Sequence, residues 1–284
     1  MPTPQTVNAA VRAIARNLLT HTSTAQLDAE LLIAHVMGHD RTWLVGHRDD
    51  ALTPTQVSRL SDLVTQRQRG IPLAYITGSK EFYGRSFIVT PDVLIPRPDS
   101  ESIVEAAITA ISPIHKPRVL EVGTGSGCIA ITIALECPNA TVRATDISPA
   151  ALQITQKNAT QLGANDCITF AQQDLLTNES GQYDLLVANL PYVPTHWLTD
   201  DNKKQYSLVT EPELALHGGD DGMDIIKRFL EQFAAHPVSD QLILEHGDGQ
   251  SVRVKKLLEQ HLPDATHTVI YDLSGKERGW QIYL

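Results

Sequence analysis

The sequence has few cysteines and no long apolar run. Its three cysteines, Cys128, Cys137 and Cys167, form no Cys-x-x-Cys pair, so we expect neither a metal site nor a disulfide framework. No apolar stretch reaches the roughly 18 residues that a membrane span requires. The N-terminal segment has no basic stretch followed by an apolar one, so no secretory signal is expected. These absences favour a reducing, cytoplasmic setting.

Positive charge is also scarce, because 23 Lys and Arg residues face 33 Asp and Glu residues and give a formal net charge of −10. Proteins that bind long nucleic acids need clustered Lys and Arg against the phosphates. The charge balance therefore disfavours a nucleic acid as the main partner. The hydrophobic content of 42% is enough for a sizeable core and argues against wholesale disorder.

The first quarter of the chain has helical patterning. Apolar residues recur at helical spacing from Val7 to Leu18. A second helix is predicted from Ser23 to about Gly38 and a third from Thr53 to Gly70. Each of these two starts with Ser or Thr and has Gln three residues later, the pattern of a capping box. We expect a small helical bundle over residues 1–72.

The next segment changes to β-rich composition. Tyr75-Ile76-Thr77-Gly78 and Phe87-Ile88-Val89-Thr90 flank a polar turn around Gly84, which predicts a β-hairpin linker over residues 73–95. Pro96-Arg97-Pro98 then imposes extended backbone and marks a boundary.

Residues 96–284 alternate between strand and helix patterns, which predicts a Rossmann-like α/β domain with a mostly parallel sheet and a C-terminal antiparallel strand. A helix is expected from Ser148-Pro149 to about Leu162, with Ser148 as its cap. The expected strands are Arg118–Val122, Thr141–Thr145, Ile168–Gln172, Tyr183–Ala188, Gln241–Leu244, Val269–Tyr271 and Gln281–Leu284.

A glycine-rich turn lies where the first of these strands meets a helix. Glu121 to Gly127 follows the pattern Glu-x-Gly-x-Gly-x-Gly, and glycines let a backbone turn tightly and approach a ligand closely. No basic residue is present in the loop to neutralise a pyrophosphate, which favours an adenosine ligand without phosphates, S-adenosylmethionine (SAM), over NAD. The alternative is a tight turn with no ligand. The expected cofactor-binding residues of this loop are Gly123, Thr124, Gly125, Ser126 and Gly127.

Carboxylates follow the next two strands. Asp146 can accept both ribose hydroxyl protons, or it can cap the following helix. Asp174, with Leu175, can meet the adenine amino group, or it can be a solvated loop carboxylate.

Asn189-Leu190-Pro191-Tyr192 follows the fourth strand and is close to the Asn-Pro-Pro-Tyr signature of enzymes that methylate planar nitrogens. The lone pair of such a nitrogen is delocalised, so its NH2 must be held by acceptors, here the Asn189 side-chain oxygen and the next backbone carbonyl. Tyr192 can offer an aromatic face to the flat group of the substrate. Asn189, Pro191 and Tyr192 are the expected catalytic residues. The whole motif is the expected substrate site, with Asn189 also bordering the cofactor. The alternative is an ordinary proline turn.

Other polar clusters have a weaker pattern. His35 and His39 have spacing that suits a metal but lack a third ligand nearby. Glu211-Pro212 and Gly218–Gly222 form a polar loop that either covers the site or is a simple turn cluster. Glu245-His246-Gly247 is interpreted as structural rather than catalytic.

These motifs together resemble the HemK/PrmC family, which methylates the glutamine side-chain nitrogen of peptide chain release factors. The resemblance covers nearly the whole chain. It rests on the helical start, Glu81-Phe82-Tyr83-Gly84, the segment from Leu94 to Glu101 (similar to the family's Ile-Pro-Arg-Pro-x-Thr-Glu), the glycine loop, Asp146, Asn189–Tyr192, the Glu211–Gly222 loop and Glu245-His246-Gly247.

The resemblance implies roles for these positions. Gly123 to Gly127 would line SAM, Asp146 would hold its ribose, and Asp174-Leu175 would lie at its adenine. Asn189 to Tyr192 would bind the glutamine of a Gly-Gly-Gln tip in release factors 1 and 2. The bundle at residues 1–72 would help to recognise the factor, and residues 96–284 would be the methyltransferase domain.

The chain departs from the family pattern at two positions. Leu190 stands where the family usually has proline, and the resulting motif is also similar to that of rRNA adenine dimethyltransferases. Ser100 replaces a threonine and keeps its hydroxyl. The alternative function is therefore a nucleic-acid adenine-N6 methyltransferase. A binding module without turnover is disfavoured by the intact Asn189 and loop glycines.

Overall fold

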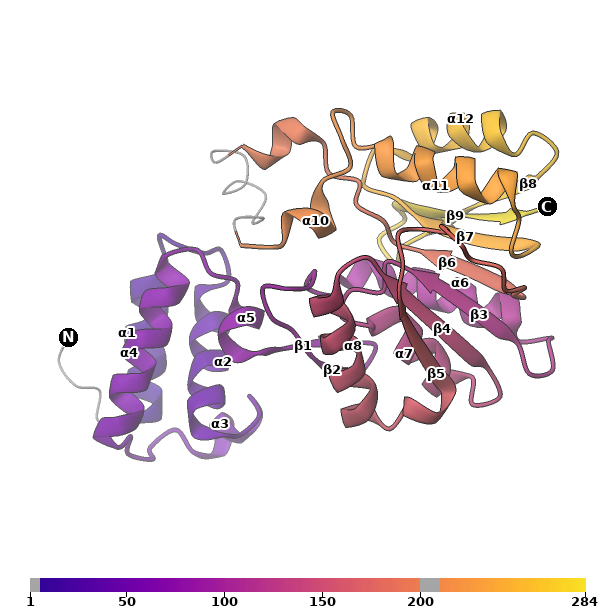
Figure 1. Ribbon diagram of the computed structural model, residues 1–284. Helices are drawn as coiled ribbons and strands as arrows, with labels where there is room; N and C mark the ends of the chain where they lie inside the picture. The colour runs from indigo at the N-terminus through magenta and orange to yellow at the C-terminus, as the bar shows by residue number, and fades with distance from the viewer. Residues whose placement is uncertain (1–5, 200–209) are drawn as a thin grey trace. The chain divides into compact units, whose positions relative to one another are not determined.

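The structure, a computed structural model, describes residues 6–199 and 210–284, which fall into two compact units (Figure 1). The first unit extends to Gly78 and the second begins at Ser79. Within the described ranges, no helix is both long enough and apolar enough to span a membrane.

The first unit is a helical bundle around its own apolar core. The apolar stripe of α1 contributes Val7, Val11, Ile14 and Leu18, all of which are buried. The predicted capping box at the start of α4 is confirmed, with Thr53 as the N-cap. The helices are α1 (Val7–Leu18), α2 (Ala25–Met37), α3 (Trp43–Gly46), α4 (Pro54–Gln68) and α5 (Leu73–Thr77).

Two local predictions for this unit are wrong. Helix α2 is capped at Thr24 rather than Ser23, and the Thr24 hydroxyl donates to Asp28 instead of accepting from the helix backbone. Residues Tyr75–Thr77 are helical rather than extended. Packing outweighs their β propensity there, because a helical turn buries Ile76 in the bundle core before Gly78 ends it in the left-handed conformation.

The second unit begins with the predicted hairpin, formed by β1 (Ser79–Phe82) and β2 (Arg85–Ile88). Tyr83 and Gly84 make its turn with φ angles of +51° and +71°, the conformation that joins two strands through two residues. Phe82 and Phe87 are fully buried and meet edge to face.

The core of the second unit is a seven-stranded sheet in the order β5-β4-β3-β6-β7-β9-β8. The first five strands in this order are parallel, and β9 runs antiparallel between β7 and β8. This confirms the Rossmann-like α/β class and its C-terminal antiparallel strand. The strands are β3 (Arg118–Val122), β4 (Thr141–Asp146), β5 (Ile168–Gln172), β6 (Leu185–Ala188), β7 (Gln241–Glu245), β8 (Thr266–Tyr271) and β9 (Glu277–Tyr283).

Helices cover both faces of this sheet (Figure 1). Alternate residues of a strand face opposite ways, so Val119 of β3 packs under α6 and α7 while Leu120 packs under α11 and α12. The helices are α6 (Glu101–Ile111), α7 (Cys128–Glu136), α8 (Pro149–Leu162), α10 (Glu213–Leu216), α11 (Asp224–Ala235) and α12 (Ser251–His261).

The strand order reverses between β3 and β6, because the chain passes from β3 to β4 and β5 on one side and from β6 to β7 on the other. Ligands of open α/β sheets bind outside the carboxyl ends of the strands at such a reversal. The loops that follow β3, β4 and β6 therefore meet at the position where the topology predicts a ligand site.

Candidate active site

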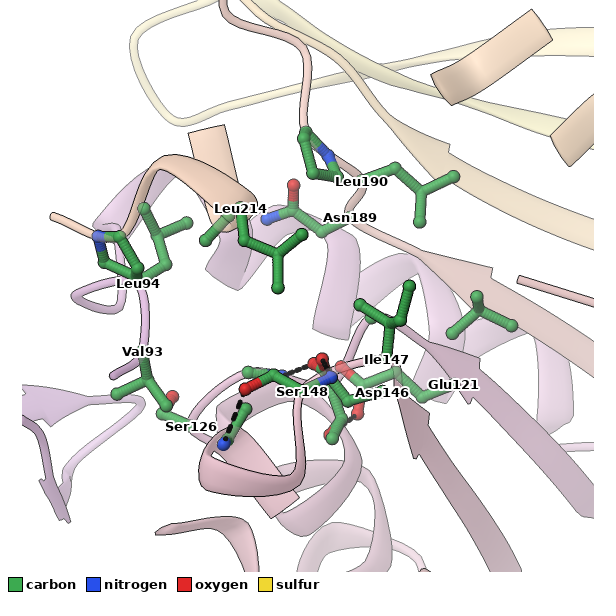
Figure 2. A pocket seen from close by; sticks show the side chains of 18 of the residues that line it. Val93, Leu94, Glu121, Ser126, Asp146, Ile147, Ser148, Asn189, Leu190 and Leu214 are labelled. Carbon is green, nitrogen blue, oxygen red and sulfur yellow. Dashed lines mark hydrogen bonds between the residues drawn. The ribbon is translucent and has the colours of Figure 1, made fainter. Parts of the chain in front are cut away.

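A cavity of about 610 Å³ opens at the carboxyl ends of β3, β4 and β6 (Figure 2), a volume typical of small-molecule sites. In this view Asn189 and Leu190 lie opposite Ser126, Asp146 and Ser148, with Leu94 and Leu214 at one side. The predicted site residues in its wall are Gly123, Thr124, Gly125, Ser126, Asp146, Asp174, Leu175, Asn189, Leu190 and Pro191.

The glycine loop needs its glycines for different reasons. Gly123, Gly125 and Gly127 have φ angles of +78°, +56° and +81°, a region that residues with a Cβ rarely adopt. A Cβ on Gly125 would meet no protein atom within 4 Å, whereas one on Gly127 would lie 2.5 Å from Thr155 Cγ2. Gly125 thus leaves open space in the cavity wall, and Gly127 lets α7 pack closely on α8.

Asp146 is held rigidly at the end of β4. Its Oδ2 accepts from the Gly125 N–H and its Oδ1 from the Ser148 N–H, each at 2.9 Å. Burial raises the pKa of Asp146, and these hydrogen bonds oppose the rise. The cap of α8 is Ser148, whose hydroxyl accepts from Ala151 N–H as predicted. The Asp146 carboxylate is therefore not the helix cap and faces the cavity.

The arginines in the cavity wall are already paired. Arg97 pairs with buried Glu211, and Arg228 pairs with Asp174 at 2.5 Å. The described wall contains no lysine. A pyrophosphate would find no uncommitted arginine or lysine in the described wall, whereas the Asp146 carboxylate, which accepts only from backbone N–H groups, suits an adenosine group carrying a positive charge. The charges of the cavity wall therefore fit SAM better than a dinucleotide.

Glu121, the first residue of the glycine motif, was not among the predicted site residues, yet it lies in the cavity wall. Burial raises its pKa to about 8, although its carboxylate accepts hydrogen bonds from the Thr124 hydroxyl and the Ala130 N–H. The acidic position of the motif was the signal that could have identified it.

The Asn189–Tyr192 turn is held by hydrogen bonds and by packing of the Leu190 side chain. Asn189 Nδ2 donates to Ser100 Oγ at 3.4 Å. The side chain of Leu190 is buried and its Cδ2 lies 3.4 Å from the position of a Cβ on Gly123. The Tyr192 carbonyl accepts from Gln250 Nε2 at 2.8 Å. Gln250 is buried and was not predicted from the sequence.

Two predicted site residues lie outside the cavity wall: Gly127, which is the N-cap of α7, and Tyr192. The Tyr192 ring packs with the core under α11 and α12. Burial raises the pKa of Tyr192, and the nearby Glu245 charge adds to the rise, so the phenol stays neutral.

The polar loop after the turn has two parts with different positions. Residues 212–215 and His217 line the cavity. Gly218 and Gly222 instead pack on the backbone of the Asn189–Tyr192 turn, because a Cβ on Gly222 would lie 2.2 Å from the Tyr192 carbonyl oxygen and one on Gly218 2.7 Å from Tyr192 Cα. Both interpretations of this loop, a cover and a turn cluster, describe part of it.

A buried carboxylate joins the two sides of the cavity rim. Glu211 accepts from the Ile95 N–H at 3.2 Å and pairs with Arg97. Its side chain is fully buried, so the paired Arg97 is what compensates its charge. The Glu211-Pro212 motif was singled out in the sequence, but its partner lies 114 residues earlier and no local pattern points to it.

The remaining candidates, His35, His39 and Cys128, interact with neighbouring side chains in ways that point to a structural role. His35 contacts Arg59, and His39 stacks on Trp43 with ring centroids 4.3 Å apart. No group of three metal-ligating side chains occurs among the described residues. Burial raises the pKa of Cys128 to about 12, so it stays a thiol.

Comparison with known proteins matches two family models: a PrmC N-terminal domain over residues 10–78 and a methyltransferase small domain over residues 103–230. A release factor glutamine methyltransferase of Bordetella pertussis is 38% identical over 93% of this chain and 96% of its own length. Proteins of the same name from Koribacter versatilis and Moorella thermoacetica are 43% and 39% identical over 76% and 91% of both chains.

Similar solved structures include the human Mettl16 catalytic domain in complex with an RNA hairpin, with a TM-score of 0.57, 16% identity and 84% of both chains covered. Another is a human methyltransferase 10 domain containing protein, with a TM-score of 0.52, 18% identity, and 71% of this chain and 88% of that chain covered. At these identities the likeness is one of fold.

Proposed function

The chain belongs to the release factor glutamine methyltransferase family, and we propose that it transfers the methyl group of SAM to the side-chain amide nitrogen (N5) of the glutamine in the Gly-Gly-Gln motif of peptide chain release factors 1 and 2. The observation that carries this proposal is the position of Asn189, at the carboxyl end of β6 and across one cavity from the glycine loop and Asp146. A cytoplasmic setting is part of the proposal, since it is where release factors act.

The cofactor would occupy the part of the cavity bounded by the glycine loop. SAM, when bound, supplies an electrophilic methyl group on a positively charged sulfur. The open space at Gly125 admits a ligand against the backbone, and Asp146 would accept from the ribose hydroxyls. Asp174 and Leu175, in the same wall, would border the adenine. The buried Glu121 lies in the same part of the wall, and its pKa of about 8 leaves it mostly neutral near pH 7.

The substrate amide would be held by Asn189 and the backbone that follows it. The Asn189 Oδ1 and the Leu190 carbonyl would accept from the two N–H bonds of the glutamine NH2, and would turn the face of the nitrogen toward the methyl group. The residue 190 carbonyl is available whatever its side chain, so leucine in place of proline is compatible with this role. Pro191 lines the cavity and Tyr192 anchors the turn.

We propose that residues 1–72 recognise the release factor, residues 73–95 link the two parts, and residues 96–284 carry out the transfer. The match of residues 10–78 to a PrmC N-terminal domain supports a distinct N-terminal part. The test is a binding measurement with the full chain. Charge reversal of exposed arginines in the first unit should weaken binding of the release factor and leave the affinity for SAM unchanged.

The proposed function is tested by incubating the full chain with methyl-labelled SAM and three substrates in separate reactions. They are a release factor, the same factor with the Gly-Gly-Gln glutamine changed to alanine, and adenine-containing DNA or rRNA. We expect label on the intact factor alone. Label on nucleic acid instead would contradict the proposal and favour adenine-N6 methylation.

Asp146→Ala is expected to weaken SAM binding about 10–100-fold, because each charge-assisted hydrogen bond to the ribose contributes roughly 1.5–3 kcal/mol. Isothermal titration calorimetry measures this change. The matched control is Asp166→Ala, an exposed carboxylate outside the cavity, which should bind SAM like the wild type. Equal affinities for both variants would exclude Asp146 as the ribose acceptor.

A further inference from the structure

A buried carboxylate lies directly behind Asn189. Strands β6 and β7 are parallel neighbours with Ala188 opposite Leu244, so Asn189, the first residue after β6, lies beside Glu245, the last residue of β7. Glu245 is 3% exposed and is not part of the cavity wall. Glu245 therefore lies next to the residue that would hold the substrate and outside the space that the substrate would occupy.

Ser100 completes a group of three around this position. It lies at the end of the Pro98–Ser100 turn, is 2% exposed, and accepts from Asn189 Nδ2. The side chains of Ser100 and Asn189 both lie near the Glu245 carboxylate and lower its pKa. Among residues 6–199 and 210–284, Glu245 Oε2 finds no hydrogen-bond partner, which is costly for a buried carboxylate oxygen unless the position requires it.

We propose that Glu245, together with Ser100, is a positioning residue that fixes the orientation of the Asn189 amide, so that its NH2 is bound from behind and its oxygen is left to accept from the substrate nitrogen. An asparagine amide has a donor end and an acceptor end of nearly equal size. Only the acceptor end can hold a substrate NH2, so an amide turned the other way would repel it. This inference rests on the proposed function and adds the residues that make Asn189 competent for it.

The charge state of Glu245 matters for this role. Burial raises its pKa to about 7, the Asp99 charge adds to the rise, and Arg278 and the hydrogen bonds from Ser100 and Asn189 oppose it. The carboxylate is therefore charged above this pH and neutral below it. A neutral carboxyl donates a proton and can hold the Asn189 oxygen instead of its NH2.

Two other titratable groups face Glu245. Tyr192 and Cys128 have raised pKa values to which its charge contributes. Both stay neutral near pH 7, so neither contributes a charge that changes the protonation of Glu245. If the charged form of Glu245 is needed to orient the amide, methyl transfer is lost as the pH falls through about 7.

The test compares kcat and SAM affinity of Glu245→Ala, Glu245→Gln and the wild type across about pH 6 to pH 8 with a release factor as substrate. Glu245→Ala should lower kcat about 10²-fold, the cost of a misplaced reacting group, with SAM affinity within about twofold of the wild type. Glu245→Gln can still accept from Asn189 through its carbonyl, so it should keep more activity and lose the fall below pH 7. The matched control is Glu179→Gln, a buried carboxylate outside the cavity, which should keep the wild-type profile.

A Glu245→Gln variant that keeps the wild-type fall below pH 7 would overturn the inference. So would a Glu245→Ala variant that loses SAM affinity and kcat together, because that result indicates a purely structural role.

A second readout separates this inference from the proposed function. In ¹⁵N NMR of the wild type, the Asn189 side-chain NH2 signal, assigned with Asn189→Ala, should titrate near pH 7 and should stop titrating in Glu245→Gln. A signal that does not titrate overturns the role of Glu245 even if no factor is methylated, and a wild type that methylates no factor overturns the function alone.

Discussion

Asn189→Ala is expected to lower kcat for glutamine methylation by roughly 10²–10³-fold, the range found when one preorganised polar contact is removed from a reacting group. The side-chain oxygen that would hold the substrate NH2 is lost, while the glycine loop and Asp146 are untouched. SAM affinity should therefore change much less than kcat. Single-turnover transfer of label from saturating SAM measures the chemical step directly.

The matched control for this variant is Asn165→Ala, an exposed asparagine outside the cavity wall whose side chain hydrogen-bonds to Thr160. It should transfer methyl groups at the wild-type rate. Unchanged transfer by Asn189→Ala would remove Asn189 from the mechanism. A parallel loss of SAM affinity would instead make Asn189 chiefly a cofactor contact.

Gly127→Ala is expected to destabilise the second unit by roughly 2–5 kcal/mol, the sum of a left-handed backbone penalty and of overpacking. Its Cβ would lie 2.5 Å from Thr155 Cγ2 and 2.8 Å from Ile131 Cδ1. Thr155 cannot easily move, because its hydroxyl donates to the Gly125 carbonyl at 2.8 Å. Urea unfolding without SAM measures the change in free energy.

Gly163→Ala separates the two contributions. Gly163 has nearly the same φ angle, +77° against +81°, but a Cβ there would meet nothing within 4 Å. We expect a loss of about 1–2 kcal/mol from backbone strain alone. Equal destabilisation by both variants would show that the close packing of α7 on α8 has little energetic weight.

The sequence was most informative where a local pattern has one structural solution. Ile168–Gln172 and the helix from Pro149 to Leu162 begin and end as predicted, because β-favouring Ile, Thr and Phe in the strand and a Ser-Pro cap on the helix leave few alternatives. The glycine loop and Asn189 stood out because glycine and asparagine directly follow strands there, and the structure places both in the wall of one cavity.

Long-range partners could not be predicted in this way. Ser100 lies 89 residues before Asn189, and nothing near Glu245 indicates that it faces both. Gln250 supports Tyr192 from 58 residues away. Such contacts depend on the strand order, which hydrophobic patterns alone do not determine. The helix at Tyr75–Thr77 was missed for a related reason, since its conformation is decided by the bundle that receives Ile76.

The bridge from Glu211 to Ile95 and Arg97 also bears on how the molecule is made. Ribosomes synthesise chains from the N-terminus, so the segment that holds Arg97 emerges well before Glu211 exists. Closing a loop of this length costs chain entropy that only later contacts repay. We therefore expect the rim to close late in folding. A nascent chain that ends before Glu211 would contain the glycine loop and Asn189 but not a finished cavity, so cofactor capture should begin only when most of the second unit has been translated.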